Sequence, residues 1–412
     1  MRSFSWMACI LLATASAQAQ GIRPLKRIEV KTSRCYKLIQ PDRLALVHDE
    51  PEWGEGDKPM AARRYHIIDF QARMALDLRL PFDPLYTEKW AGLFFAGPTW
   101  ANKADQKFPT FDSWLVALDP DAGTGGLLLR DKFEDKQTRA WKNRHHYIAF
   151  DPKTGELDWS LLLEQAEGSR AQHHDYYLVS VGPEPGGQRH WFCSMWRIPT
   201  SDGKQLARIR LLSVDIQKRA IDFDHRFDTP PSENKRVASG LRIDAGPRFR
   251  FFSFREYSEK GDPQARMHVL DTTDKTHFSL PVPPTPYGCA IDRQGHFMAV
   301  ASNQMGLLTL YDLRAKKQVR QVQCVRKIHK LVLSADDKRL FAFAHGRQAE
   351  IRAWPSLKRL ERVQAKKAFS DKEDYFSPEV AVSSADGKII LLPPTKEYGF
   401  AKDDAVWVVE LR

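Results

Sequence analysis

Two histidine groups in this sequence have the residue types that hold metal ions, His145-His146 and His173-His174-Asp175. Imidazole nitrogens and carboxylate oxygens are common ligands for transition metals. Adjacent residues of a strand point to opposite faces of the sheet, so a pair within a strand cannot bind one ion, whereas a pair in a loop can. Because most such groups are solvated loop residues or local hydrogen bonders, we expect no metal and no cofactor. The candidate ligands are His173, His174 and Asp175.

Acidic residues recur at the ends of apolar, strand-like runs, where a carboxylate could act as an acid or a base. The set comprises Asp69, Asp151, Asp215, Asp271 and Asp312. A residue that recurs with each structural unit favours a structural role, in which its carboxylate accepts backbone N–H bonds from the following turn. The linear spacing assigns no Ser-His-Asp or Cys-His set, so the catalytic residues, if there are any, stay unknown at this stage.

Cysteine usage leaves the disulfide question open. Cys35, Cys193, Cys289 and Cys324 lie downstream of the N-terminal segment, at wide and irregular spacings. These spacings fit no zinc pattern and no haem attachment site. An even number of cysteines in an oxidising compartment allows two bridges. Buried free thiols are the alternative for Cys193 and Cys289, which fall in apolar runs.

A repeated pattern in the C-terminal half predicts the fold that must position these residues. Residues 289–300, 331–342 and 381–392 each read as a short apolar strand, a polar turn with Asp or Gly, and a second apolar strand. A third strand follows in each unit. A repeat of roughly 40–55 residues built from short strands is typical of a β-propeller. We therefore expect an all-β protein.

The number of units favours seven blades, with eight as the alternative if residues 114–119 form a third strand rather than a first. The last unit ends at Leu411, one strand short of four. Propellers close their ring by pairing an N-terminal strand with the last blade, which removes an open sheet edge. We expect the alternating segment from Leu25 to Thr32 to supply this strand. Gly123, Gly125 and Gly126 fit a hairpin turn better than a phosphate-binding loop.

An insertion over residues 84–111 interrupts the first units and carries four aromatic residues, Trp90, Phe94, Phe95 and Trp100. Loops of a propeller open onto one rim of the ring, where insertions build binding surfaces. Aromatic side chains suit contact with a partner or ligand. The alternative is that they cover an exposed part of the core. We take these four residues as the candidate binding residues.

One segment carries a family resemblance. Residues 149–159 are similar to the Ala-x-Asp-x-x-Thr-Gly-x-x-x-Trp motif of quinoprotein propellers, through Asp151, Thr154, Gly155 and Trp159. With the repeats, the chain resembles the seven-bladed propellers of the YVTN/WD40-like and quinoprotein-like group. The resemblance implies a structural role, in which Thr-Gly makes a turn and Trp159 packs between blades. The adjacent cysteine pair of quinoprotein alcohol dehydrogenases is absent, so we expect no quinone cofactor.

The N-terminus and the net charge indicate where the protein acts. Residues 1–19 have the pattern of a secretory signal, with an apolar stretch from Trp6 to Ala15 and small residues at Ala17 and Ala19. This stretch is too short to span a bilayer. Residues 20–412 then form one propeller domain, exported to the periplasm or the extracellular space, with no transmembrane segment. The net charge of +11 suits anionic surfaces.

Basic residues are spread along the chain, and the densest group, at 358–367, is interrupted by Glu361. We therefore expect no nucleic-acid partner. The function we predict is a non-catalytic binding or assembly module for a protein or a cell-envelope component. The alternative is a hydrolase or lactonase-like enzyme with its site at the central channel. Lactonase-type propellers supply that precedent, by resemblance, with carboxylates and an arginine at the channel.

Overall fold

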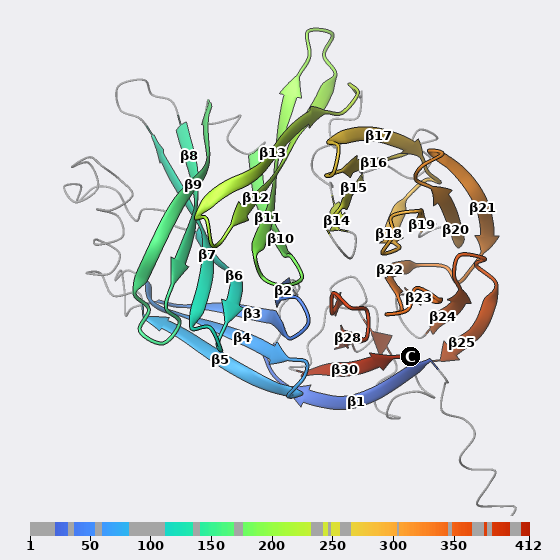
Figure 1. Cartoon of the computed structure of the whole chain (residues 1–412), viewed down its shortest axis with the longest axis horizontal. Helices are drawn as coiled ribbons and strands as arrows, with labels where there is room; N and C mark the ends of the chain where they lie inside the picture. The colour runs from blue at the N-terminus through green and yellow to red at the C-terminus, as the bar shows by residue number, and fades with distance from the viewer. Residues whose placement is uncertain are drawn as a thin grey trace, which may run out of the picture.

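The computed structural model describes residues 21–31, 37–53, 60–81, 112–134, 141–168, 176–231, 242–245, 249–255, 265–302, 305–344, 348–364, 375–376, 381–395 and 405–412. These residues form strands joined by turns, and no helix occurs among them. Seven four-stranded sheets surround a common axis as the blades of a propeller (Figure 1). The structure thus confirms the all-β, seven-bladed fold that the sequence predicts.

The first three blades use strands that follow one another along the chain. Blade 1 consists of β2 (Lys37–Gln40), β3 (Leu44–Trp53), β4 (Met60–Asp69) and β5 (Met74–Pro81). Blade 2 consists of β6 (Asp112–Asp119), β7 (Thr124–Glu134), β8 (Trp141–Phe150) and β9 (Leu157–Gly168). Blade 3 consists of β10 (Tyr176–Pro183), β11 (Arg189–Pro199), β12 (Gln205–Asp215) and β13 (Ala220–Asp228). Since β6 is the first strand of its blade, the eight-bladed alternative is wrong.

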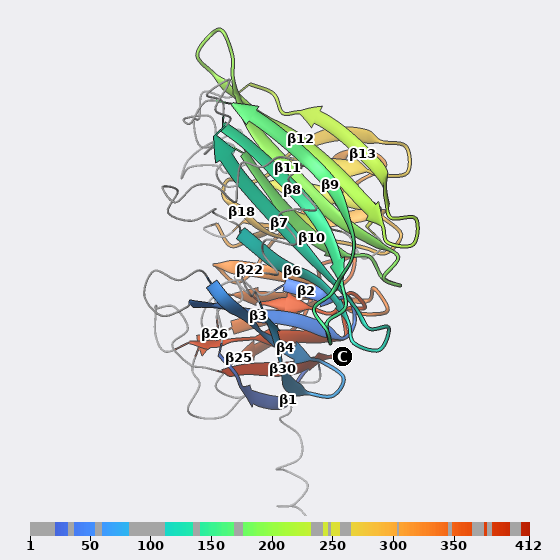
Figure 2. The same cartoon turned by 90° about the vertical axis from the view of Figure 1, so that its left-hand side faces the viewer.

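The later blades have shorter strands. Blade 4 consists of β14 (Arg242–Ala245), β15 (Phe251–Arg255), β16 (Arg266–Asp271) and β17 (Thr276–Pro281). Blade 5 consists of β18 (Pro286–Ile291), β19 (Phe297–Ser302), β20 (Leu307–Asp312) and β21 (Lys317–Gln323). Blade 6 consists of β22 (Ile328–Leu333), β23 (Arg339–Ala344), β24 (Gln348–Ala353) and β25 (Arg359–Gln364). Figure 2 shows the longer strands of blades 2 and 3 running side by side.

The last blade joins the two ends of the chain. Blade 7 combines β27 (Val382–Ser383), β28 (Ile389–Leu392) and β30 (Ala405–Leu411) with the N-terminal strand β1 (Ile22–Glu29). A separate pair, β26 (Tyr375–Phe376) and β29 (Pro394–Thr395), lies in the same part of the sequence. β1 runs antiparallel to β30, from Ile22 opposite Leu411 to Glu29 opposite Ala405. The expected closure is confirmed.

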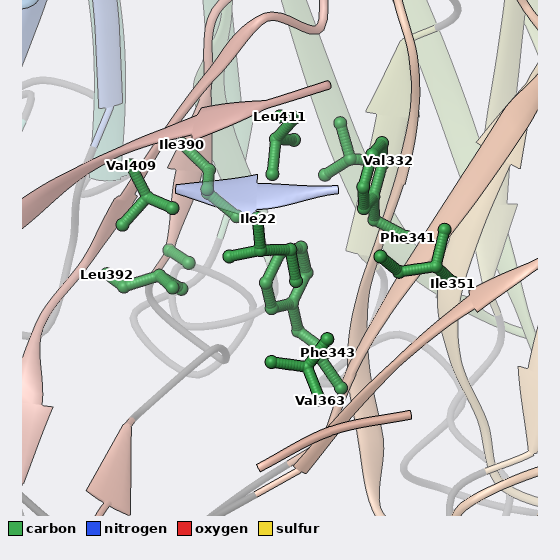
Figure 3. Packing of buried hydrophobic residues seen from close by; sticks show 12 residues of the cluster. Ile22, Val332, Phe341, Phe343, Ile351, Val363, Ile390, Leu392, Val409 and Leu411 are labelled. Atoms are coloured by element: carbon green, nitrogen blue, oxygen red, sulfur yellow. The ribbon is translucent and has the colours of Figure 1, made fainter. Parts of the chain in front are cut away.

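The closing strand begins three residues before the predicted segment, which started at Leu25. The reason lies in burial, because Ile22 is 4% exposed and Ile28 is 6% exposed. Ile22 packs between blades 6 and 7, together with Phe343 and Val409 (Figure 3). Ile28 packs between blades 7 and 1. The strand therefore seals two blade junctions, and alternation within 25–32 alone did not reveal the first of them.

The hydrophobic core is divided between the blades. One cluster of buried apolar side chains lies at each junction of neighbouring blades, and together the clusters go once around the ring. Each sheet is thus covered on both faces, which explains why its inner strands read as short apolar runs. Stability is shared among junctions rather than concentrated in one centre.

The inner turns explain the sequence repeat at 289–300, 331–342 and 381–392. The first polar residue of each turn accepts backbone N–H groups: Asp292 from His296 and Phe297, Ser334 from Lys338 and Arg339, and Ser384 from Ile389. The fourth position has a positive φ at Gly295 and Gly387. That conformation favours glycine, which is why the repeat carries it.

The outer turns use the recurrent aspartates as the sequence indicated. Asp69 accepts the backbone N–H groups of Gln71 at 2.9 Å and Ala72 at 2.8 Å. Asp151, Asp215, Asp271 and Asp312 each accept at least one such bond from the turn that follows. The structural role expected for these five carboxylates is confirmed.

A basic residue at the last position of three outer turns reaches back to the preceding blade. These residues have positive φ angles, and each lies over an aromatic ring of the blade before: Arg219 over Trp159 at 6.0 Å, Lys275 over Phe223 at 5.2 Å and Lys316 over Phe278 at 4.9 Å. A cation held over a ring face is attracted by the ring's negative quadrupole. We call these three contacts the blade clasps.

A buried ion network stabilises the outer half of blade 6. Glu350 is fully buried, and Arg352 donates to it through Nε at 3.0 Å and to the Leu357 carbonyl at 2.8 Å. Arg362 donates to the second oxygen of Glu350 at 2.7 Å. Both oxygens of the buried carboxylate are thus compensated, as burial of a charge requires.

The described cysteines do not bridge one another. Cys193 and Cys324 have free thiols, and the Ser253 hydroxyl donates to the Cys289 sulfur at 3.4 Å. Burial raises the pKa of Cys324 to about 12, so the thiol form is favoured. Cys35 lies outside the described residues, and so does the predicted signal at 1–19.

Candidate functional site

A pocket of about 750 Å³ opens on the face of the ring that carries the inner and outer turns of blades 1, 2 and 3. Its lining comes from the turns β2–β3, β4–β5, β6–β7, β8–β9, β10–β11 and β12–β13 and from the strand ends beside them. The inner strands β2, β6 and β10 contact one another here. A volume of this size falls in the range of small-molecule and side-chain sites, roughly 300–1000 Å³.

Two buried aromatic residues from different blades meet in the lining. The ring centres of Tyr147 in β8 and His190 in β11 lie 5.5 Å apart, at 78°. Tyr147 also packs against Trp159 of β9, at 5.2 Å between ring centres. His190 is 5% exposed and its Nδ1 has no hydrogen-bond partner among the described residues. Polar atoms without a partner are rare in protein interiors, and they call for an explanation.

Two glycines of β7 make room for this arrangement. A Cβ at Gly126 would lie 2.3 Å from the Tyr147 hydroxyl oxygen, and a Cβ at Gly125 would lie 2.3 Å from the Phe150 ring. The two aromatic rings therefore occupy space that side chains at Gly125 and Gly126 would fill. β7 begins at Thr124, so both glycines are strand residues. The predicted hairpin turn is confirmed at Gly123, which has a positive φ, but Gly125 and Gly126 already belong to the strand.

Burial decides the charge state of His190. Removal from water lowers the pKa of His190 to about 3, so the imidazole is neutral near pH 7. Burial also raises the pKa of Tyr147 above its usual value, which favours the protonated hydroxyl. The floor of the pocket is thus uncharged, with one hydroxyl and one neutral imidazole among aromatic rings.

The rim of the pocket is acidic. Its lining includes five aspartates and two arginines, a formal excess of three negative charges. The aspartates are Asp42, Asp119, Asp121, Asp151 and Asp158, and the arginines are Arg43 and Arg219. The chain as a whole carries +11. The local sign is therefore opposite to that of the rest of the protein.

Most of these carboxylates already have a structural partner. Asp119 accepts the backbone N–H groups of Asp121 and Ala122 at 3.1 and 3.0 Å. Asp42 accepts the backbone N–H of Asp386 at 2.9 Å, across the junction of blades 7 and 1. Arg43 pairs with Asp121 and, at 2.9 Å, with Asp69. Carboxylates engaged in this way hold the turns in place.

Arg219 and Asp158 form the loosest pair of the rim. Their closest atoms, Nη2 and Oδ1, are 3.5 Å apart, and the side chains are 56% and 53% exposed. Arg219 also forms the first blade clasp over Trp159. An aromatic face, a carboxylate and a cation thus come together at the pocket mouth.

The inner turns of blades 5, 6 and 7 are tied to one another beside this pocket. The Arg293 N–H donates to Asp337 at 3.0 Å, and its guanidinium donates to the carbonyls of Ala335 and Asp386. A further bond joins Ala385 N–H to the Pro41 carbonyl at 2.9 Å, from blade 7 to blade 1. Arg293 therefore holds the inner turns of blades 5, 6 and 7 together. The pocket opens on the other side of the axis, at blades 1 to 3.

The predicted site residues fall partly outside the structure described. Trp90, Phe94, Phe95 and Trp100, with the insertion 84–111, lie outside the described residues, as do His173, His174 and Asp175. His145 and His146 lie in β8 and are buried. Burial lowers the pKa of His146 to about 4. In the described part of the chain no three His, Cys, Asp or Glu residues gather in a way that could hold a metal ion.

The quinoprotein-like segment, in contrast, lies at the pocket. Asp151 accepts the Lys153 N–H at 2.7 Å, its carbonyl accepts the Gly155 N–H at 2.7 Å, and Gly155 has φ +72°. This turn leads into β9 and sets Trp159 against Tyr147. Reasoning from sequence missed Tyr147 and His190, which carry no local motif. Their only signal is a polar residue within an apolar strand.

Comparisons with known proteins identify no family for this chain. No family model matches the sequence, and no curated protein matches it. Among solved structures, the chain is similar to one titled "Crystal Structure of Mitotic Checkpoint Complex". The identity is 10%, the TM-score is 0.49, and the match covers 94% of this chain and 92% of that chain. Similarity at this level says nothing of function. No helix in the described residues has the length and apolar character needed to cross a membrane.

Proposed function

We propose that this protein is an exported, non-catalytic binding module that receives a polypeptide partner at the pocket of blades 1 to 3. The observation that carries the proposal is the pocket itself, a concave space of about 750 Å³ built by the turns of three blades. Sites that combine an aromatic floor with a few polar groups are typical binding sites. A rigid ring with turns on one face suits recognition of another protein.

The chemistry of the lining favours binding over catalysis. A general base works best with a pKa near the working pH, whereas burial lowers the pKa of His190 to about 3. Asp119 and Asp151 are engaged by backbone N–H groups. The hydrolase or lactonase-like alternative at the central channel therefore has less support, because the described lining pairs no base with a nucleophile.

Site-specific cross-linking tests the proposal. Gly187, in the β10–β11 turn, borders the pocket, and a Cβ there meets nothing within 4 Å. Gly203, in the β11–β12 turn at the other end of β11, is equally open and also has a positive φ. A photo-reactive group attached to Gly187→Cys should capture an envelope protein, and Gly203→Cys should not. Equal capture at both positions, or none at Gly187→Cys, would contradict the proposal.

Export to the periplasm or the extracellular space belongs to the same proposal and is supported by the signal-like residues 1–19. N-terminal sequencing of the protein from fractionated cells tests it. A mature start next to Ala19, in the exported fraction, is the expected result. An intact N-terminus in the cytoplasmic fraction would overturn this part.

A second candidate function, attachment to an anionic lipid surface, is favoured by one edge of the ring. Lys317 at the start of β21, Lys358 just before β25 and Arg359 at the start of β25 are exposed, and none has an ion-pair partner among the described residues. Arg320 donates to the Ser356 carbonyl at 2.6 Å, which joins the two blades there. Figure 1 shows β21 and β25 following one another around the outside of the ring.

Vesicle sedimentation tests this candidate. Lysines and arginines near an anionic leaflet contribute about 1 kcal/mol each to binding. Binding to phosphatidylglycerol vesicles should be lost in high salt and in the double variant Lys317→Glu/Lys358→Glu. The exposed Lys153→Glu in blade 2 is the control and should bind normally. Equal binding to neutral phosphatidylcholine vesicles would contradict the candidate.

A further inference from the structure

The pocket of blades 1 to 3 differs from the rest of the protein in charge. Its lining has three more carboxylates than guanidinium groups, on a chain of net charge +11. Low-dielectric walls lined by one sign of charge concentrate ligands of the opposite sign. The pocket therefore favours a cationic group over an anionic one.

The mouth of the pocket also has the components of a cation site. The Trp159 ring, which packs on Tyr147, offers its outer side to the guanidinium of Arg219 at 6.0 Å. The Asp158 carboxylate lies 3.5 Å from the same guanidinium. Arginine and lysine cations bind in this way, between an aromatic face and a carboxylate. The protein's own Arg219 thus shows that a cation fits there.

Arg219 is held only weakly in this position. It stands at the end of a turn with φ +55°, and its side chain is 56% exposed. Exposed ion pairs of this kind contribute little to stability. The other two blade clasps, of Lys275 and Lys316, border no part of this pocket. A competing cation could therefore replace Arg219 without loss of the blade junction.

Inside the mouth, the described lining residues present no uncompensated positive charge to a bound cation. The imidazole of His190 borders the pocket 5.5 Å from the Tyr147 ring, and its Nδ1 lacks a partner among the described residues. Because burial lowers the pKa of His190 to about 3, it adds no positive charge at neutral pH. Arg43, the second arginine of the lining, is neutralised by Asp69 and Asp121.

We propose that the pocket recognises an arginine or lysine side chain of the partner polypeptide, bound between Trp159 and Asp158 in the place that Arg219 holds in the free protein. This inference rests on the proposed function and adds the chemical class of the ligand. Arg219 then acts as an internal competitor that sets the affinity, since the partner's cation must displace it.

The test uses the mature chain with small probes, N-acetyl-arginine amide and its neutral isostere N-acetyl-citrulline amide, followed by calorimetry or ligand-observed NMR. The arginine probe should bind and the citrulline probe should not. Arg219→Gln should tighten binding about two- to fivefold, because a cation over an exposed ring contributes about that much. Asp158→Asn and Trp159→Leu should weaken it by a similar factor or more.

Lys316→Gln is the matched control, because it removes a blade clasp that lies away from the pocket. It should leave probe binding unchanged, and unfolding midpoints of all variants report whether the ring is intact. Equal binding of both probes, no binding even to Arg219→Gln, or no effect of Asp158→Asn would overturn the inference. If Gly187→Cys still captures a partner in any of these cases, the proposed function stands and only the ligand class fails.

Discussion

The guanidinium of Arg219 lies 6.0 Å from the ring centre of Trp159, so that blade 3 reaches back over the outer strand of blade 2. Blades 4 and 5 repeat this relationship through Lys275 and Lys316. In each case the basic residue stands at the turn position with positive φ. The same contact thus serves blade packing at two junctions, and at the third it also shapes the mouth of a pocket.

The closing strand should contribute strongly to stability. Ile22→Ala removes a side chain that is 4% exposed and packs between blades 6 and 7. Truncation of a buried isoleucine costs about 2–5 kcal/mol. Denaturant unfolding should show this loss, whereas Val319→Ala, at a position 51% exposed, should change the unfolding free energy by less than about 0.5 kcal/mol. Equal small effects would mean that β1 is dispensable.

The buried network of blade 6 should tolerate no missing charge. Glu350→Gln leaves Arg352 with a buried guanidinium and no carboxylate. Breaking a buried pair in this way costs about 3–5 kcal/mol, measured by chemical denaturation. Glu361→Gln, one strand away and partly exposed, is the control. A Glu350→Gln protein as stable as the parent would contradict this prediction.

Filling the space beside Tyr147 should disturb the pocket. The new methyl group of Gly126→Ala would lie 2.3 Å from the Tyr147 hydroxyl oxygen, so the ring must move. Overpacking of this kind costs about 1–3 kcal/mol, visible as a lower unfolding free energy. Tyr147→Phe in the same chain removes the oxygen and should restore part of the loss. Absence of coupling between the two changes would contradict the packing described.

Acid should destabilise the fold in part through His190. Burial lowers the pKa of His190 from 6.5 to about 3 in the folded state, whereas the unfolded chain titrates normally. Between these pH values the unfolded state binds a proton that the folded state does not, so the unfolding free energy falls as pH falls from about 6.5. His190→Phe should flatten this dependence in unfolding curves recorded at several pH values. An unchanged slope would assign the effect to other groups.

Much of this architecture could be predicted from the sequence because propeller blades are local. Strand, turn and strand follow one another within a few residues, and Ser334 and Ser384 mark the turns directly. The closing strand was placed correctly at β30, although its start at Ile22 was missed, because burial there depends on blade 6.

The pocket could not be predicted in the same way. Tyr147 and His190 come from different blades, and no spacing along the chain relates them. The glycines that leave room for Phe150 and Tyr147 read as turn residues, but the structure places both in the strand β7. Among the lining residues, the sequence indicates Asp151 as a turn residue and Trp159 as a packing residue, and the structure adds that both border the pocket.

The pairing of β1 with β30 makes the order of synthesis matter. β1 is the first strand of the ring to be made, yet its partner β30 is the last strand of the ring, and the backbone bond from Arg412 to Gly21 at 2.9 Å closes the circle. Until then β1 has an open edge, which is where strands from other molecules can pair. Because Gly21 and Arg412 are adjacent, they can be joined in a circular permutant with new termini in the turn at Gly203. In that permutant β30 and β1 are made one after the other, so it should form the same ring without a long interval in which β1 is unpaired.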